Sequence, residues 1–281
     1  MNLKDFTCDD IAFLKNKARL LRKDIIEMIH IARAGHPGGS LSIVEIVTAL
    51  YFHVMNIDPQ NSDWAKRDRF ILSKGHACPA LYAALAERGY FDRKHLATLR
   101  RYNSILQGHP DMNKTPGVDM TTGSLGNGLS IGVGMALSSH LKNQQYNVYV
   151  LLGDGEIQEG MVWEAAMSAA KYNLNNLVAI IDYNGMQING WVDDIMRIEP
   201  LADKWKSFGW SVLEIDGHDI KEILSAFQTA EKMRGPVVII AKTVKGKGVS
   251  FMENNLEWHG KAPNDREAEC AVTEILERER Q

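Results

Sequence analysis

Apolar residues near the N-terminus recur at alternating intervals of three and four residues. This spacing places them on one face of a helix. Gly35 and Pro37 come next, and both are residue types that end helices. We therefore predict an amphipathic helix whose apolar face consists of Ile11, Leu14, Ala18, Leu21, Ile25, Met28 and Ala32.

Three later segments are short continuous apolar runs rich in β-branched residues. Such runs are typical of strands that are buried on both faces of a parallel sheet. Helical patterns at 161–172 and 219–233 lie between them. The alternation predicts an α/β fold: a mostly parallel central sheet with helices on both faces and right-handed crossovers. The runs are 147–152, 177–182 and 236–243, and 210–216 is predicted as a further strand.

The chain shows no sign of a division into domains. No internal repeat, low-complexity tract or long Gly/Ser linker interrupts it, so we expect residues 1–281 to form a single domain. The charge-rich end, 264–281, is predicted to be a solvated helix.

Composition excludes several classes of function. The net charge is −3 and no dense Lys/Arg block is present, so we expect no nucleic-acid partner. The cysteines are far apart and form no CxxC, which argues against a disulfide framework or a zinc site and favours the reduced cytoplasm. They are Cys8, Cys78 and Cys270.

Targeting and membrane signals are missing from the sequence. The N-terminus lacks the basic-then-apolar profile of a secretion signal. The most apolar window, 42–55, is interrupted by Glu45 and His53, so we expect no membrane span.

The turn GDGEIQEG places Asp154 directly after the strand predicted at 147–152. Ligands of open α/β sheets bind beyond the carboxyl ends of the strands, and the helix that follows favours anions at its N-terminus. A carboxylate would repel a diphosphate there unless a divalent cation lies between them. Asp154 is therefore a candidate metal ligand. The alternative is an ordinary strand-to-helix turn, because Gly and Asp favour turns for conformational reasons.

The next predicted strand ends in a second oxygen-rich turn, which contains Asn184. It lies thirty residues after Asp154, about the length of one β-α-β unit. Hard oxygen ligands on two adjacent strand ends suit Mg²⁺ or Ca²⁺ better than zinc. The glycines of the first turn allow the backbone to approach phosphates closely.

These two turns resemble the signature of thiamine diphosphate enzymes, GDG followed by Asn-Asn, which holds a Mg²⁺-diphosphate. Tyr183 stands where that pattern has its first Asn, and Asn184 keeps the metal-binding position. The resemblance implies a thiamine diphosphate-binding fold of the diphosphate (PP) type. It also implies that Asp154, Asn184 and the main-chain carbonyl of Met186 hold Mg²⁺, for which Ca²⁺ or Mn²⁺ can substitute, and that Gly155 contacts the cofactor.

Four histidines lie in short contexts flanked by glycine or proline. Each one alone could be a surface or structural histidine. Their contexts AGHPGGS, SKGHA, QGHPD and EWHGKAP match, in order, histidine motifs of transketolase, and the resemblance extends through TTGSLGNG, GDGEIQEG and TVKGKG. The four are His36, His76, His109 and His259.

The resemblance to transketolase implies roles for these residues. His36, His109 and His259 are expected to contact the transferred two-carbon unit, and His76 and His259 also to approach the diphosphate. Imidazoles suit this reaction because the ketose carbonyl oxygen becomes negative as its carbon–carbon bond is made or broken. Lys245 matches a family lysine near the phosphates, although it could also be a solvated loop lysine.

A glycine-rich segment precedes the predicted strand at 147–152. Glycine is costly in a helix, so the glycines of 121–140 indicate close approach of the backbone to another group. The resemblance implies that Gly123 and Leu125 present main-chain atoms to the cofactor and that the helix packs at a subunit interface. A loop followed by an ordinary helix is the alternative. Glu159 matches a glutamate of the carboxylate network that links active sites, or it is simply a helix N-terminal acid.

A full-length transketolase is more than twice as long as this chain. The expectation is that the pyrimidine-binding and C-terminal domains are on a separate partner chain, in a heterotetramer with two copies of each chain. The pair would transfer a glycolaldehyde unit from a ketose (phosphate) to an aldose (phosphate). Two alternatives are a subunit of a 2-oxoacid dehydrogenase or synthase, which the histidine set disfavours, and a non-catalytic cofactor-binding module.

Overall fold

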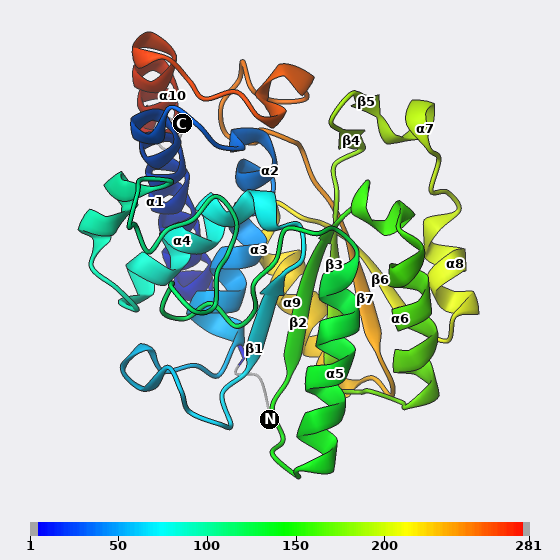
Figure 1. Ribbon diagram of the computed structural model, residues 1–281. Helices are drawn as coiled ribbons and strands as arrows, with labels where there is room; N and C mark the ends of the chain where they lie inside the picture. Colours follow the sequence, from blue (N-terminus) through cyan, green and yellow to red (C-terminus); the bar gives the residue numbers. More distant parts are fainter. Residues whose placement is uncertain (1–4, 278–281) are drawn as a thin grey trace.

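The computed structural model describes residues 5–277, which form a five-stranded sheet covered by helices on both faces (Figure 1). All neighbouring strands are parallel, in the spatial order β1-β2-β3-β7-β6. The predicted α/β fold is confirmed. The strands are β1 (Arg69–Leu72), β2 (Val148–Gly153), β3 (Leu177–Tyr183), β6 (Ser211–Asp216) and β7 (Val237–Lys242).

Successive residues of the inner strands enter two separate cores. In β2, Tyr149 and Leu151 belong to one buried cluster, while Val148, Val150 and Leu152 belong to the other. Both faces of a parallel strand must be apolar for this arrangement, which explains the continuous runs in the sequence. The first core is completed by α1 (Cys8–Ala32), α3 (Val44–Ala49), α4 (Cys78–Arg88) and α9 (Ile220–Lys232), and the second by α5 (Asn127–Leu141), α6 (Gly160–Lys171) and α8 (Leu201–Ser207).

The predicted strands and the two predicted crossover helices, α6 and α9, agree with the structure to within one residue at each end. The first helix begins earlier than its apolar stripe, because Thr7 and Asp10 form a capping box. The Thr7 hydroxyl accepts the Asp10 N–H at 3.2 Å, and the Asp10 carboxylate accepts the Thr7 N–H at 2.8 Å. The edge strand β1 was not predicted, since four residues are too few to show a pattern.

The C-terminal helix α10 (Asp265–Glu277) corrects the prediction of a solvated helix. It packs beside α1 (Figure 1) and buries Ala268, Ala271 and Ile275 in the first core. Its remaining face is polar, so the helix is amphipathic rather than solvated all round. The predicted residues 278–281 lie outside the described part of the chain.

Several short elements lie between the longer helices and strands. A hairpin and a small helix rise above β3 in Figure 1. These are β4 (Met186–Gln187), β5 (Gly190–Trp191) and α7 (Val192–Ile195), and the other short segments are α2 (Pro37–Leu41), the π-turn Leu50–Val54 and the 3-10 turns Pro59–Asn61, Gly75–Ala77, Arg93–Thr98, Glu156–Gln158 and Leu256–His259. Within residues 5–277 no helix combines the length and apolar character needed to cross a bilayer.

Candidate active site

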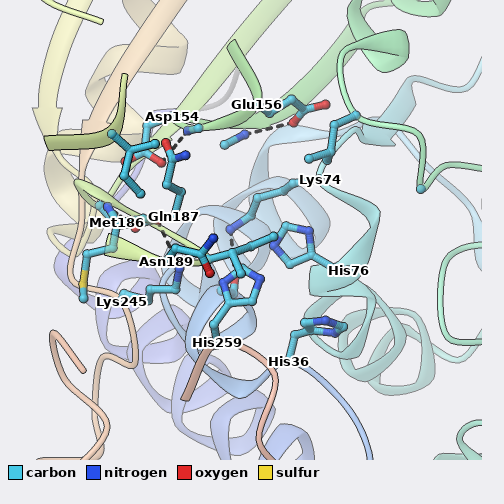
Figure 2. A pocket seen from close by; sticks show the side chains of 18 residues that line it. His36, Lys74, His76, Asp154, Glu156, Met186, Gln187, Asn189, Lys245 and His259 are labelled. Carbon is cyan, nitrogen blue, oxygen red and sulfur yellow. Dashed lines mark hydrogen bonds between the residues drawn. The ribbon is translucent and has the colours of Figure 1, made fainter. Parts of the chain in front are cut away.

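A pocket of about 350 Å³ lies at the carboxyl ends of β2 and β3. This volume is within the range of about 300–1,000 Å³ that small-molecule sites occupy. Figure 2 shows side chains from distant parts of the chain converging on it. Its position is the one expected for a ligand site in an open α/β sheet.

Strand pairing brings the two oxygen-rich turns together. β2 and β3 are neighbours, with Gly153 opposite Asp182, so the turns that follow them are adjacent. The carboxylate of Asp154 accepts the N–H of Gly155 at 2.8 Å and the N–H of Gly185 at 2.5 Å. Asp154 is thereby fixed between the two turns, with its side chain on the pocket.

Asn184 and Met186 complete the predicted ligand set. Asn184 Oδ1 accepts the N–H of Met186 at 3.1 Å, and the Met186 carbonyl accepts a hydrogen bond from Lys245 Nζ at 3.0 Å. No group of three or more His, Cys, Asp or Glu side chains in residues 5–277 is placed to hold a metal ion. The donors at this site are one carboxylate, one amide and one carbonyl, which is the oxygen set that a hard divalent cation prefers.

Burial shifts the pKa values of ionisable side chains in the pocket. Burial and the neighbouring Asp182 carboxylate raise the pKa of Asp154 to about 7. Burial and the Lys74 ammonium lower the pKa of Lys245 to about 8. A divalent cation beside Asp154 would favour its ionised form, so the residues present fit a metal-bound diphosphate.

Lys74 is a pocket residue that the sequence analysis missed. Its ammonium lies 2.5 Å from the Asp182 carboxylate in a fully buried ion pair, and it donates to the Gly39 carbonyl at 2.8 Å. Burial raises the pKa of Asp182, but the Lys74 ammonium and the hydrogen bonds from Lys74, Thr243 and Ser42 together keep it below its usual value. The signal was available in the sequence, because Lys74 is two residues before His76 in the SKGHA segment.

Three of the four histidines form a triangle on the pocket wall (Figure 2). The ring centroids are 5.3 Å apart for His36 and His76, 5.6 Å for His36 and His259, and 5.4 Å for His76 and His259. His36 precedes α2, His76 lies in the turn Gly75–Ala77, and His259 ends the turn Leu256–His259. The fold therefore assembles the triangle from three segments that are distant in sequence.

The imidazoles of the triangle are neutral near pH 7. Burial, together with nearby cationic groups, lowers the pKa of His36 and of His259 to about 4. Burial and the Lys74 ammonium lower the pKa of His76 well below its usual value. A neutral imidazole donates one hydrogen bond and accepts another, so the triangle can orient hydroxyl groups without adding positive charge.

The other predicted residues fall into two groups. Gly123, Leu125 and Gly155 line the pocket with the residues described above. His109 does not line it: the side chain is exposed, and a Cβ on Gly123 would lie 3.2 Å from its ring.

Glu159, which the resemblance also implied as a cofactor-binding residue, does not line the pocket. It is exposed and lies beside Gly126, outside the pocket. The acid of the GDGEIQEG turn that reaches the pocket is Glu156, which is buried and accepts the N–H groups of Gly126 at 2.9 Å and Gly153 at 3.0 Å. Burial raises the pKa of Glu156.

The sequence analysis also missed the apolar residues at the edge of the pocket. Ile188, which follows β4, and Ile195 of α7 line the pocket with the polar residues Gln187 and Asn189. The sequence gives no local signal for these positions, because the hairpin is only two residues wide on each side.

Comparison with known proteins agrees with this geometry. Residues 12–275 match the family model "Transketolase, thiamine diphosphate binding domain". The chain is 49% identical to 6-deoxy-6-sulfo-D-fructose transketolase subunit SqwG of a Clostridium species, over 93% of this chain and 96% of the relative. It is 45% identical to one of the subunits of apulose-4-phosphate transketolase from Phocaeicola vulgatus, over 92% of each chain.

Solved structures give the same result. The crystal structure of transketolase from Campylobacter jejuni matches with a TM-score of 0.89 and 33% sequence identity. The match covers 94% of this chain but 43% of the solved chain, so this chain corresponds to less than half of that transketolase. The predicted resemblance is confirmed: the chain belongs to the transketolase family and matches its thiamine diphosphate binding domain.

Proposed function

We propose that this chain is the diphosphate-binding subunit of a two-chain transketolase. The observation that carries the proposal is the pocket itself, where the oxygen donors Asp154, Asn184 and Met186 adjoin the triangle of neutral imidazoles. The two bacterial relatives that match along nearly their whole length support it, since both are named as transketolase subunits.

In this proposal the diphosphate end of the pocket binds a Mg²⁺ ion. Asp154, Asn184 and the Met186 carbonyl supply oxygen ligands, and Lys245 balances part of the remaining negative charge of the phosphates. Gly155 and Gly123 leave room for the backbone to approach the ligand. Thiamine diphosphate, when bound, supplies the carbon nucleophile and the electron sink for making and breaking the ketose carbon–carbon bond.

The histidines act on the sugar. His36 and His259 orient the hydroxyl groups of the two-carbon unit, and His76 and His259 also approach the diphosphate. A neutral ring accepts a proton from one oxygen while it donates to another. We assign His109 to the outer side of the sugar, because it lies beside Gly123 at the pocket edge. Ile188, Ile195 and Leu125 exclude water from the reacting atoms.

The proposal includes a second chain with the pyrimidine-binding and C-terminal domains, in a cytoplasmic heterotetramer with two copies of each chain. We assign Glu159 to a contact with other chains, since it is exposed beside Gly126 and does not line the pocket. The relatives are named for 6-deoxy-6-sulfo-D-fructose and apulose-4-phosphate, sugars that carry an acid group. We propose a ketose with a terminal acid group as donor, with pentose phosphates as the default.

Reconstitution tests this function. The chain is mixed with a candidate partner, thiamine diphosphate and Mg²⁺, and turnover is measured with ketose phosphate, sulfonated ketose and 2-oxoacid donors. Turnover of a ketose is expected only with both chains present, and His259→Ala should reduce it by about 100-fold or more. Turnover of 2-oxoacids alone would support the dehydrogenase or synthase alternative. Cofactor binding by the pair without turnover of any ketose would support a non-catalytic module.

A further inference from the structure

The loop after β7 carries Lys245 into the pocket, and a polar network of Arg22, Glu45 and His218 holds the backbone of this loop. Arg22 of α1 and Glu45 of α3 form an ion pair with 2.6 Å between Nη2 and Oε1. Glu45 Oε2 lies 3.0 Å from Nδ1 of His218, and His218 Nε2 accepts the N–H of Val244 at 2.8 Å. None of these groups lines the pocket, and the proposed function does not use them.

The partners of His218 determine its tautomer. A backbone N–H can only donate, so Nε2, which faces Val244, must be unprotonated. The proton of the neutral ring is then on Nδ1 and is donated to Glu45. Burial raises the pKa of Glu45, but the Arg22 guanidinium and His218 outweigh it and keep that pKa below its usual value. The acceptor of the Nδ1 proton is thus an ionised carboxylate.

The arginine of this ion pair also holds a second backbone group of the loop. Arg22 Nε donates to the Lys247 carbonyl at 3.0 Å. Gly248 has a φ of +95°, and a Cβ there would lie 2.7 Å from Arg22 Cδ, so only glycine leaves room for the arginine side chain. Lys245 is therefore bracketed by two anchored backbone groups, the Val244 N–H and the Lys247 carbonyl.

We propose that His218 is a positioning residue for the cofactor site. It joins the Arg22–Glu45 pair to the backbone of Val244 and so holds Lys245 at the diphosphate end of the pocket. A lysine side chain has four rotatable bonds, so its ammonium has a defined position only if the backbone that carries it is fixed. The inference rests on the proposed function for the identity of the ligand, but not for the geometry of the loop.

Two substitutions of His218 distinguish the contributions of its two ring nitrogens. Glutamine places its amide near the position of Nε2, so His218→Gln keeps an acceptor for the Val244 N–H and loses the donor to Glu45. Asparagine reaches only the position of Nδ1, so His218→Asn keeps the donor and loses the acceptor.

Amide hydrogen exchange of Val244, measured by NMR on the chain alone, is the direct readout. We expect exchange in His218→Asn to be faster than in wild type by about two- to tenfold, the effect of one hydrogen bond, and exchange in His218→Gln to stay near the wild-type rate. Equal acceleration in both variants, or none in His218→Asn, would overturn the proposal.

Cofactor affinity gives a second readout, by calorimetric titration of thiamine diphosphate and Mg²⁺ into the reconstituted pair. His218→Asn should weaken binding by about tenfold, while His218→Gln retains it and the two variants unfold at similar temperatures. A residue with only a structural role would lower affinity and unfolding temperature together in both variants. If the wild-type pair binds no cofactor, the proposed function fails, and the Val244 exchange result still decides the inference.

The wild-type chain provides a check that requires no folded variant. Nitrogen-15 NMR distinguishes a protonated from an unprotonated ring nitrogen in histidine. We expect His218 to show a proton on Nδ1 and none on Nε2. A proton on Nε2 is incompatible with the bond from Val244 and would overturn the proposal.

Discussion

Asp154 shows how burial sets the chemistry of one residue. Its carboxyl is held by two backbone N–H groups, yet burial and the Asp182 carboxylate raise its pKa to about 7. The folded chain therefore carries a carboxyl that is costly to ionise until a cation is bound. In this respect Asp154 differs from Asp182, for which Lys74 supplies the opposite charge within the chain.

We predict that Asp154→Ala weakens the Mg²⁺-dependent binding of thiamine diphosphate by more than about 100-fold, because an essential oxygen ligand is lost. The free energy of unfolding should not fall, since the variant no longer buries a carboxyl that is costly to ionise. Calorimetric titration and urea unfolding measure the two quantities. Asp203→Ala, at an exposed position of α8, is the control and should bind normally. Unchanged cofactor binding in Asp154→Ala would refute the metal-ligand assignment.

The histidines of the triangle depend on their neighbours in a different way. The Nδ1 atoms of His36 and His259 are buried without a hydrogen-bond partner in the described structure. The rings are therefore positioned by packing and by their T-shaped contact with each other. Each histidine motif was visible in the sequence, but the contact between the rings was not.

At the scale of elements, helix α5 shows why a chain accepts glycines in a helix. A Cβ on Gly132 would lie 2.5 Å from Val150 Cγ2 in the middle of β2, and one on Gly128 would overlap Ser73. These glycines let α5 approach the sheet closely, as the sequence suggested. Gly134 is different, because it is exposed and a Cβ there would meet nothing within 4 Å.

The two kinds of glycine give opposite predictions. Gly132→Ala should lower the free energy of unfolding by about 1–3 kcal/mol, because the added methyl group must displace a buried, β-branched neighbour. Gly134→Ala should raise it by about 0.5–1 kcal/mol through helix propensity alone. Urea unfolding of the two variants and wild type provides the comparison. Equal effects of the two substitutions would show that α5 does not pack on the sheet in this way.

At the scale of the whole molecule, the first and last helices of the described chain pack together. Helix α10 packs on α1, and both belong to the same core as α4 and α9. If the chain consisted of independently folding parts, these helices would not share one core. We therefore propose that the chain unfolds as one unit, in agreement with the single domain expected from the sequence.

Ala271→Asp tests this proposal. Ala271 of α10 is fully buried in the first core, so an aspartate there should lower the free energy of unfolding by at least about 2 kcal/mol. We expect the single calorimetric transition of the wild type to move to lower temperature without splitting. Cys270→Ser, at the exposed neighbouring position, should leave it unchanged. A second, smaller calorimetric transition at a different temperature would show that α10 unfolds independently of the rest of the chain.

The sequence by itself determined four of the five strands of the sheet, the crossover helices α6 and α9, and the first two turns of the site. The apolar character of a short segment is a local property, so it located β2, β3, β6 and β7 to within one residue. The length of one β-α-β unit was enough to place Asp154 beside Asn184, since successive parallel strands joined by a helix are commonly neighbours.

The tertiary structure alone decided which distant groups meet. The imidazole triangle joins residues 36, 76 and 259, and the buried pair Lys74–Asp182 spans more than a hundred positions. No local pattern encodes such contacts, because they follow from how helices pack on the two faces of the sheet. The same holds for the exposure of Glu159 and for the chain from Arg22 through His218 to Val244. Sequence motifs identify the candidate functional residues. Packing determines the distances between them and their burial, and these in turn determine their charges.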